Sequence, residues 1–558
     1  MRFLPIAAAS LLLASCAATD APAPPLPIRT APNAQFIEGD LRYLASDALE
    51  GRQTGERGFD TAANYVAGRF EAIGLKPGGD DGTWFQRVDL RLKRYGEKNG
   101  NTIALNGPNA VQLTQIEDVL VTGRGAAESG SIEAPVIFVG QGFVDSEGGR
   151  DDLAGIDLTG KIALALYGAP EYLGAEEGAY YRSTRIDRLK EAGAIGVISL
   201  NERKADEEPD DWEQSKDYYF NYVTATWVGP DGTAFGSDGD YEVYATLRPD
   251  AGERLMARQP FSLEKAFEIA NDPNGRFTPF DTGLTATMRW DQKFDPVESR
   301  NVIGMVEGAD PALKDEYVVL TAHLDHVGMD DPHHGKADED ARAGVDHGPR
   351  DLIHNGAMDN ASGVAIMLDV ARRLAIDPPR RSVLFIALTA EEMGLVGSSY
   401  NAHYPTVPPG SVVANVNMDM PILTYEFVDA VAFGAERSTL YPVVKAAAAR
   451  AGVELVPDFN PDEALFTRSD HYSYVEMGVP SVYLDTGPGN GGDEILETFL
   501  KEHYHAVSDE VELIDFGQAA RFADINFEIA HGIGDMDERP VWVKGDFFGT
   551  VFGGEMAE

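Results

Sequence analysis

Apolar residues after position 300 fall into runs of strand length, separated by stretches with helical spacing. Residues 361–375 carry apolar side chains at the spacing of one helix face. Four continuous apolar runs accompany this helix, at residues 317–322, 382–388, 412–416 and 481–484. Continuous apolar strands that alternate with helices indicate a sheet covered on both faces. The pattern therefore predicts an α/β core with a mixed, mostly parallel sheet flanked by helices.

The residues before this core begin with two helices and continue with short strands. Residues 35–49 fit an amphipathic helix interrupted by turn residues, and residues 61–73 fit a second helix that ends at Gly74. Short apolar runs then alternate with loops rich in Gly, Asp and Glu, at residues 134–139, 161–166, 195–200 and 241–247. We interpret residues 115–292 as an inserted β-rich domain. It either shapes access to a site or is a packing module without a role in chemistry.

The first residues have the pattern of an export signal. Arg2 precedes an apolar stretch that is too short to span a membrane. Small residues then lead to Cys16, which resembles a bacterial lipoprotein signal whose cysteine becomes the lipidated amino terminus. The alternative is a chance cysteine after an ordinary signal peptide. We expect an exported lipoprotein of the bacterial cell envelope, on the periplasm-facing outer membrane, that is attached only through a lipid on Cys16.

These patterns predict six parts along the chain. They are a signal peptide at 1–15, an Ala/Pro-rich tether at 16–34, the first part of the core domain at 35–114, the insert at 115–292, the remainder of the core at 293–535, and a C-terminal tail at 536–558. The tail matches no pattern with a functional meaning.

Charge and cysteine content narrow the classes of function. The formal net charge of −45 repels phosphate backbones and anionic lipid, so nucleic-acid binding is excluded as a first hypothesis. Cys16 is the only cysteine. If it is lipidated, the mature chain has no free thiol, which excludes cysteine catalysis and thiolate metal ligands.

Metal-competent side chains follow three of the predicted strands. His323 follows residues 317–322, Glu391 and Glu392 follow residues 382–388, and Asp419 follows residues 412–416. The carboxyl ends of parallel strands meet at one edge of a sheet, where α/β proteins place ligand sites. We therefore expect these side chains to converge at that edge.

Two further residues complete a candidate site for two Zn²⁺ ions. Asp359 precedes the predicted helix at 361–375, and His505 lies in a loop after a short helical run. Imidazole and carboxylate groups suit zinc without thiolate, and two ions need a bridging carboxylate. We predict that Asp359 bridges the ions, that His323 and Asp419 bind one of them, and that Glu392 and His505 bind the other.

Three neighbouring residues are candidates for catalytic roles. Glu391 adjoins the ligand Glu392 and is positioned to act as the base that accepts a proton from metal-bound water. Asp325 lies two residues from His323 and is positioned to accept the second ring N–H of that histidine. Tyr504 is positioned to donate a hydrogen bond to an oxyanion.

Each of these residues taken alone has a simpler interpretation. A single His or Asp at a strand end usually caps a turn, and a Glu-Glu pair is usually solvated surface. The hypothesis of a metal site therefore depends on all of these residues lying together. Four further histidines lie in or beside a Gly- and Asp-rich loop that begins at Gly328, and we interpret them as loop residues. They are His333, His334, His347 and His354.

The segments that hold the candidate ligands resemble zinc exopeptidases of the aminopeptidase Y type, which are related to glutamate carboxypeptidases and the transferrin receptor. The matching segments are residues 323–326 (HLDH), 355–363 (NGAMDNASG), 390–398 (AEEMGLVGS), 417–420 (NMDM), 469–471 (SDH) and 504–505 (YH). The resemblance implies the same ligands and the same base as the strand-end argument. Residues 160–162 and 192–198 of the insert are similar to a protease-associated domain. The acidic loop at 328–350 departs from the family pattern, so substrate preference does not transfer.

The resemblance implies hydrolysis of a terminal peptide bond, with peptides that have a free amino terminus as the default substrates. Carboxypeptidases share the same metal set and stay open as an alternative. A second alternative is a single-zinc aminoacyl cyclase or amidohydrolase on a similar core. A third is a non-catalytic binding protein on a peptidase fold. The oligomeric state is not indicated by the sequence.

Overall fold

The computed structural model describes residues 31–96, 100–145, 149–203, 211–221, 223–237, 241–329 and 351–558. The predicted signal peptide, Cys16, most of the tether and most of the 328–350 loop lie outside the described residues, as do His333, His334 and His347. Within the described part of the chain, no helix is both long enough and apolar enough to cross a bilayer.

The core sheet has the predicted mixed, mostly parallel arrangement. Its strand order is β19-β18-β20-β17-β13-β16-β12. The four central strands run parallel to one another and are β13 (Tyr317–His323), β16 (Ser382–Leu388), β17 (Val412–Asn417) and β20 (Ser481–Thr486). The strand β18 (Asp429–Phe433) is antiparallel to β20, and β19 (Glu454–Leu455) pairs with β18. All four apolar runs after position 300 are therefore confirmed as neighbouring strands.

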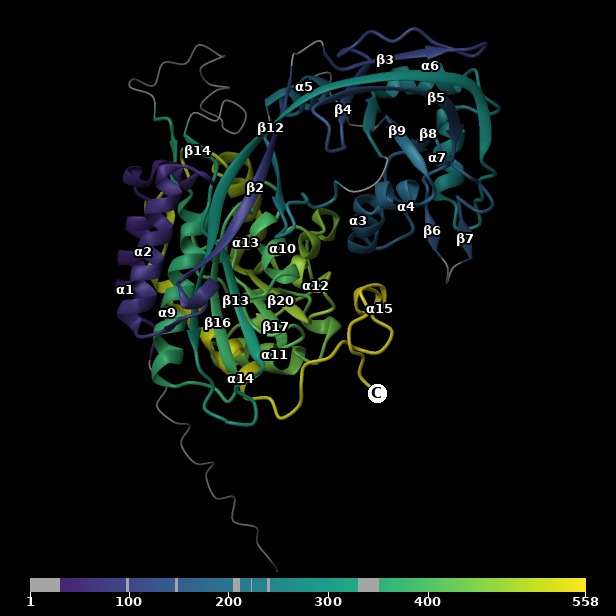
Figure 1. Ribbon diagram of the computed structural model, residues 1–558. Helices are drawn as coiled ribbons and strands as arrows, with labels where there is room; N and C mark the ends of the chain where they lie inside the picture. Colours follow the sequence, from purple (N-terminus) through teal and green to yellow (C-terminus); the bar gives the residue numbers. More distant parts are fainter. Residues whose placement is uncertain are drawn as a thin grey trace, which may run out of the picture.

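Helices cover both faces of the core sheet (Figure 1). One face is covered by α1 (Ala34–Leu44), α2 (Arg57–Ile73), α9 (Gly363–Ile376), α11 (Tyr441–Arg450) and α14 (Phe516–Gly534). The shorter helices α10 (Val396–His403) and α12 (His471–Val475) lie on the other face. Helix α2 begins four residues before the predicted start and ends at Gly74, whose φ of 92° is the left-handed conformation that glycine tolerates.

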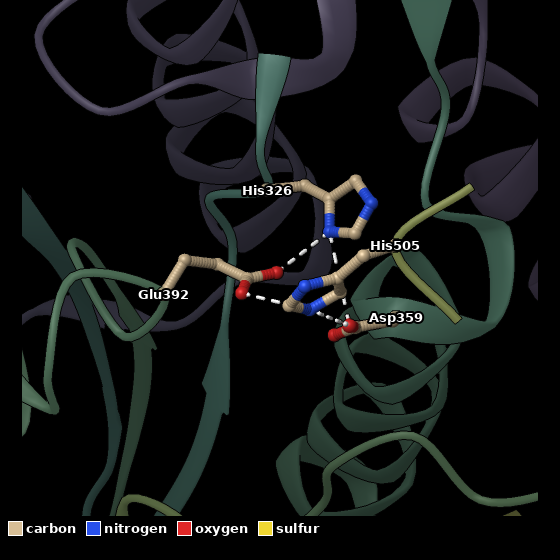
Figure 2. Close-up of side chains that lie close together, drawn as sticks. All are labelled: His326, Asp359, Glu392 and His505. Atoms are coloured by element: carbon tan, nitrogen blue, oxygen red, sulfur yellow. Dashed lines mark hydrogen bonds and ion pairs between the residues drawn. The ribbon is translucent and has the colours of Figure 1, made fainter. Parts of the chain in front are cut away.

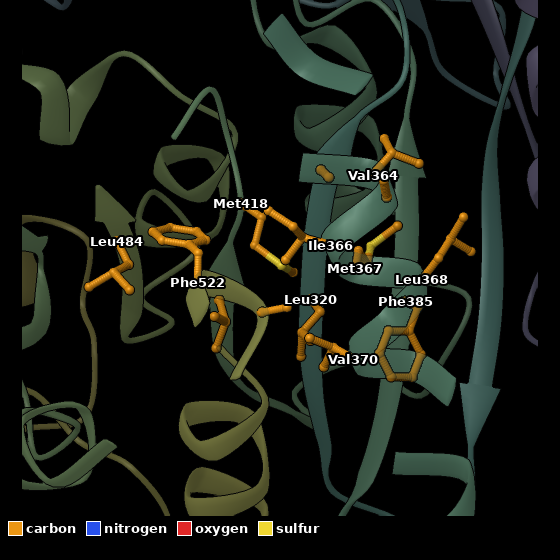
Figure 3. Close-up of a cluster of buried hydrophobic side chains, with 14 of the residues drawn as sticks. Leu320, Val364, Ile366, Met367, Leu368, Val370, Phe385, Met418, Leu484 and Phe522 are labelled. Carbon is orange, nitrogen blue, oxygen red and sulfur yellow. The ribbon is translucent and has the colours of Figure 1, made fainter. Parts of the chain in front are cut away.

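The apolar run of β13 is continuous because both faces of this strand are buried. Val318 and Leu320 belong to the large cluster beneath α9 and α14, whereas Val319 packs into a smaller cluster with Ile386 and Tyr474. Successive side chains of a strand point to opposite faces, so a strand buried on both faces is apolar at every position. Figure 3 shows the larger cluster, with Leu320 of β13 among side chains of α9, β16 and α14.

One long strand joins the core to a second sheet. The strand β12 (Phe280–Val306) pairs with β5 (Ser129–Phe138) along its first part, with β2 (Phe85–Tyr95) along its middle, and with β16 at its end. Figure 1 shows β12 arching between the two halves of the molecule. The predicted domain boundary at residue 292 falls inside this strand. The division of the chain into domains stays a prediction.

The second sheet has the strand order β12-β5-β8-β9-β11-β4. The strands β8 (Lys161–Leu166), β9 (Ala194–Leu200) and β11 (Val243–Leu247) account for three of the four predicted runs, and β5 accounts for the fourth. The strand β4 (Val119–Gly123) had no predicted run. Five helices accompany these strands, so the segment is itself α/β. They are α3 (Ala175–Ser183), α4 (Arg185–Glu191), α5 (Asp211–Asn221), α6 (Pro249–Met256) and α7 (Leu263–Asn271).

The C-terminal residues pack against the rest of the molecule. Trp542 is fully buried, and its indole N–H donates to the carbonyl of Gly478 at 2.8 Å. The short helix α15 (Phe547–Val551) follows, and Phe547 contacts Tyr180 of α3 with ring centroids 5.3 Å apart. This segment therefore joins the core to the second sheet.

Candidate metal centre

Three adjacent strands deliver the candidate side chains to one edge of the core sheet. The order β17-β13-β16 places the carboxyl ends of these parallel strands side by side. His323 is the last residue of β13, Asp419 lies two residues after β17, and Glu391 and Glu392 follow β16. These side chains therefore lie together at this edge, as predicted.

Asp359 lies between two imidazoles. Its Oδ1 is 3.1 Å from Nε2 of His323, and its Oδ2 is 3.1 Å from Nε2 of His505. The residue is buried in the turn that leads into α9, and His505 approaches from the loop after α13 (Gly492–Glu502). The two oxygens of one carboxylate thus face two different sets of donors.

The donors form one set on each side of Asp359. On one side, Nε2 of His323 is 3.0 Å from Oδ1 of Asp419. On the other, Nε2 of His505 is 3.0 Å from Oε2 of Glu392. The ligand atoms of each set lie within 4.8 Å of one another. All five predicted ligand residues are brought together.

The chemistry of this cluster fits divalent cations. Four carboxylates gather here, from Asp359, Glu391, Glu392 and Asp419, and burying carboxylates is costly unless positive charge compensates. Burial alone would lower the pKa of His323, but Asp419, Glu391 and Asp359 raise it well above its usual value. Nitrogen and oxygen donors without thiolate suit zinc. The residues present can therefore hold zinc ions.

Glu391 lies in the loop after β16, beside the donors. Its Oε2 lies 3.9 Å from Nε2 of His323, so it faces the cluster. Burial raises the pKa of Glu391 well above its usual value, and the nearby carboxylates Asp419 and Glu392 raise it further. A carboxylate with a raised pKa takes up a proton more readily at neutral pH.

The predicted contact of Asp325 differs from the observed one. The Nδ1 of His323 is 3.1 Å from the backbone carbonyl of Asp325, not from its carboxylate. The carboxylate instead accepts the backbone N–H groups of Glu391 at 3.2 Å and Glu392 at 3.4 Å. In the loop after β13, the backbone carbonyl of Asp325 therefore faces the His323 ring, and its side chain faces the loop after β16. Asp325 therefore orients the His323 ring through its backbone and the two glutamates through its side chain.

Tyr504 lies beside the cluster. Its ring stacks on that of His505, with centroids 3.9 Å apart, and about a third of the residue is exposed. Burial and the carboxylates of Asp359, Glu392 and Glu391 raise the pKa of Tyr504 well above its usual value. Its hydroxyl therefore stays protonated and able to donate a hydrogen bond.

Several groups that hold the donors in place had no prediction from the sequence. The buried carboxylate of Asp509 accepts the backbone N–H groups of Met358 at 2.9 Å and Asp359 at 3.0 Å. The hydroxyl of Ser469 donates to Oδ2 of Asp419. Ser469 belongs to one of the segments that carried the family resemblance, which was the only signal in the sequence that pointed to it.

Arg52 holds two of the loops at the site. This buried guanidinium donates to the carbonyls of Leu324 at 2.9 Å, Asn355 at 2.7 Å and Gly356 at 3.0 Å. Burial lowers the pKa of Arg52 to about 10, and the carboxylate of Asp359 opposes that change. The cation thus joins the loop after β13 to the loop that carries Asp359.

His326 is a further residue of the site that had no predicted role. Its ring is buried, and Nδ1 lies 2.7 Å from Oε1 of Glu392. Figure 2 shows His326, Glu392, His505 and Asp359 converging from four separate segments. The loop histidine His354 is also buried but belongs to no donor set among the described residues, which agrees with its interpretation as a loop residue.

The fold and this donor set define a core of the metal-dependent peptidase class. Residues 301–530 match the model of Peptidase family M28. The match includes every predicted ligand from His323 to His505. The assignment of the insert as a protease-associated domain stays a prediction.

Curated relatives cover part of the chain. A Glutamate carboxypeptidase 2 homolog of Caenorhabditis briggsae is 24% identical over 334 residues, which are 52% of this chain and 38% of the relative. Aminopeptidase YwaD of Bacillus subtilis (strain 168) is 26% identical over 196 residues, which are 34% of this chain and 40% of the relative. The chain thus covers well under two thirds of the length of either protein.

A solved structure with a similar fold is the aminopeptidase from Aneurinibacillus sp. strain AM-1. The superposition has a TM-score of 0.51 and covers 90% of this chain and 94% of that chain, at 18% sequence identity. At this identity the likeness supports the fold.

Proposed function

We propose that this protein is a metal-dependent exopeptidase, of the aminopeptidase type, that uses two zinc ions and the base Glu391. The observation that carries the proposal is the position of Asp359, whose two oxygens face His323 on one side and His505 on the other. A carboxylate placed in this way suits a bridge between two ions.

When bound, the zinc ions would polarise the scissile carbonyl and lower the pKa of a water molecule. The residues of the chain supply the remaining functions. Glu391 accepts the proton of the attacking water and delivers it to the leaving amine. Tyr504 donates a hydrogen bond to the carbonyl oxygen as that oxygen gains negative charge. Asp325 fixes the backbone that carries Glu391, so the base keeps its direction.

The charge of the site favours a free amino terminus as the group that binds. Glu391 and Asp419 are the most exposed carboxylates of the cluster, with 14% and 13% of their side chains exposed, and they attract an ammonium group. Relatives named as glutamate carboxypeptidases make carboxypeptidase activity the second candidate. A carboxypeptidase needs a cation that pairs with the substrate carboxylate. Two described cations lie near the donors: Arg52 is committed to backbone carbonyls, and Arg468, near Tyr504, pairs with Glu463.

A panel of dipeptides tests the proposal. The purified protein is assayed on free, N-blocked and C-blocked dipeptides, with and without a chelator. We expect cleavage of the free and C-blocked substrates, loss of activity with the chelator, and recovery with zinc. Glu391→Gln should lower kcat by about 10²–10⁴ while zinc content is unchanged. Cleavage of N-blocked substrates alone would instead indicate a carboxypeptidase.

The same assays distinguish two alternative functions from the proposed one. A single-zinc cyclase or amidohydrolase would show full activity with one ion per chain and a cyclic or deamidated product. A binding protein without activity would retain zinc and release no amino acid from any substrate. Turnover unchanged in Glu391→Gln would remove Glu391 as the base.

We also propose that the chain is an exported lipoprotein held to a membrane only by a lipid on Cys16. The support is the small residues before this single cysteine. In a bacterial host, Cys16→Ala should move the protein from the membrane fraction to the soluble fraction. Unchanged fractionation would exclude the lipid tether.

A further inference from the structure

His326 is placed among the donors on the His505 side of the site. Its Nδ1 is 2.7 Å from Oε1 of Glu392 and 3.8 Å from Oδ2 of Asp359. Its ring meets that of His505 edge-on, with centroids 5.5 Å apart. Figure 2 shows Nδ1 of His326 directed at the space between Glu392 and Asp359, which His505 also borders.

The distances are within about 0.6 Å of those between ligands of one tetrahedral ion. Zinc–nitrogen and zinc–oxygen bonds of about 2.0–2.2 Å in a tetrahedron place neighbouring donor atoms roughly 3.3–3.6 Å apart. The proposed ligand His505 lies 3.1 Å from Oδ2 of Asp359 and 3.0 Å from Oε2 of Glu392. The distances of 2.7 Å and 3.8 Å from His326 bracket the expected value. The donor atoms of all four residues lie within 4.8 Å of one another.

We propose that His326 is a fourth protein ligand of the ion held by Asp359, Glu392 and His505. The inference rests on the proposed di-zinc function and makes the two ions unequal. One ion has three terminal protein ligands besides the bridge, whereas the ion at His323 and Asp419 has two. A tetrahedral shell filled by protein is typical of structural zinc, and an open position is typical of catalytic zinc. The ion at His323 would therefore have the more open shell of the two.

The competing explanation is that His326 only donates a hydrogen bond from Nδ1 to Glu392. Within the described residues Nε2 of His326 has no hydrogen-bond partner under either explanation, so the distinction depends on Nδ1. An asparagine at this position separates the two. Its amide N–H₂ reproduces the Nδ1 donor, but an amide nitrogen is not a zinc ligand.

The experiment measures zinc content after dialysis and zinc release to a colorimetric chelator. The wild type should hold two ions and release them in two phases. His326→Asn should accelerate the slower phase by at least about tenfold, in the direction of the positive control His505→Asn. The matched control His354→Asn changes a buried histidine outside the donor sets and should leave both phases as in the wild type.

Each outcome decides the proposal. Release from His326→Asn that is identical to that of His354→Asn would overturn it and leave the di-zinc function intact. A wild type without zinc would overturn both. If His326→Asn does not fold, a zinc-loaded wild-type crystal gives the answer. An Nδ1–zinc distance of about 2.0–2.1 Å would support the proposal, and a distance beyond about 3 Å would overturn it.

Discussion

The carboxylate of Asp325 accepts the backbone N–H of Glu391 at 3.2 Å. The two residues are separated by 66 positions, and the contact ties the loop after β13 to the loop after β16. Since the same carboxylate also accepts the N–H of Glu392, one side chain sets the direction of both the proposed base and its neighbouring ligand.

Asp325→Asn should therefore impair catalysis more than metal binding. The amide of asparagine can accept only through its carbonyl oxygen, so one of the two N–H groups loses its partner. We expect kcat to fall by about 10- to 100-fold with two zinc ions retained. Steady-state kinetics and metal analysis of the same preparation check this. Asp89→Asn, on the exposed surface of β2, is the control. Equal kcat for the two variants would contradict the positioning role.

His471 should make the folded protein sensitive to acid. It is fully buried between the rings of Phe466 and Tyr483, and burial lowers its pKa to about 3. In the unfolded chain its pKa is about 6.5. Between these values the unfolded chain binds a proton that the folded protein does not. The contribution of His471 to the free energy of unfolding should therefore fall by about 1.4 kcal/mol for each pH unit below 6.5.

The variant His471→Phe removes this contribution because phenylalanine does not titrate. Urea unfolding of the two proteins between pH 7.5 and 5, with a chelator present so that zinc release contributes to neither, measures the difference. The variant should lose less stability than the wild type on acidification. Parallel curves would show that His471 does not titrate differently in the two states.

The C-terminal segment should contribute strongly to stability although the sequence had no pattern for it. Trp542→Ala removes a fully buried indole and is expected to cost about 3–5 kcal/mol. The adjacent Val543 is exposed, so Val543→Ala should change stability by about 0.5 kcal/mol or less. The midpoint of urea unfolding by circular dichroism compares them. Equal midpoints would mean that the segment is not part of the cooperative fold.

The core was predictable because burial on both faces leaves a local signal. A strand such as β13 is apolar throughout and then ends abruptly in His323, which marks both the strand and the edge of the sheet. The same reasoning located Glu391, Glu392 and Asp419. The site could be anticipated because each candidate follows a strand that is recognisable by itself.

The parts that the sequence missed depend on contacts between distant segments. Asp509 and Arg52 act through hydrogen bonds to backbone groups, and no residue type or spacing predicts which backbone groups they meet. His326 sits in a turn, where no periodicity applies. Helix α3 was missed because it has no clear apolar face. Two acidic residues precede a glycine in it, and tyrosines follow. Its tyrosines pack against Phe143 and against Phe547 of α15, which is more than 350 positions away.

The position of zinc around Asp359 decides whether this carboxylate bridges two ions. A crystal of the zinc-loaded protein, measured on both sides of the zinc absorption edge, locates the ions by anomalous scattering. We expect two peaks about 3.5–4 Å apart, one beside Oδ1 of Asp359 with His323 and one beside Oδ2 with His505. A single peak, or two peaks of which only one touches Asp359, would contradict it.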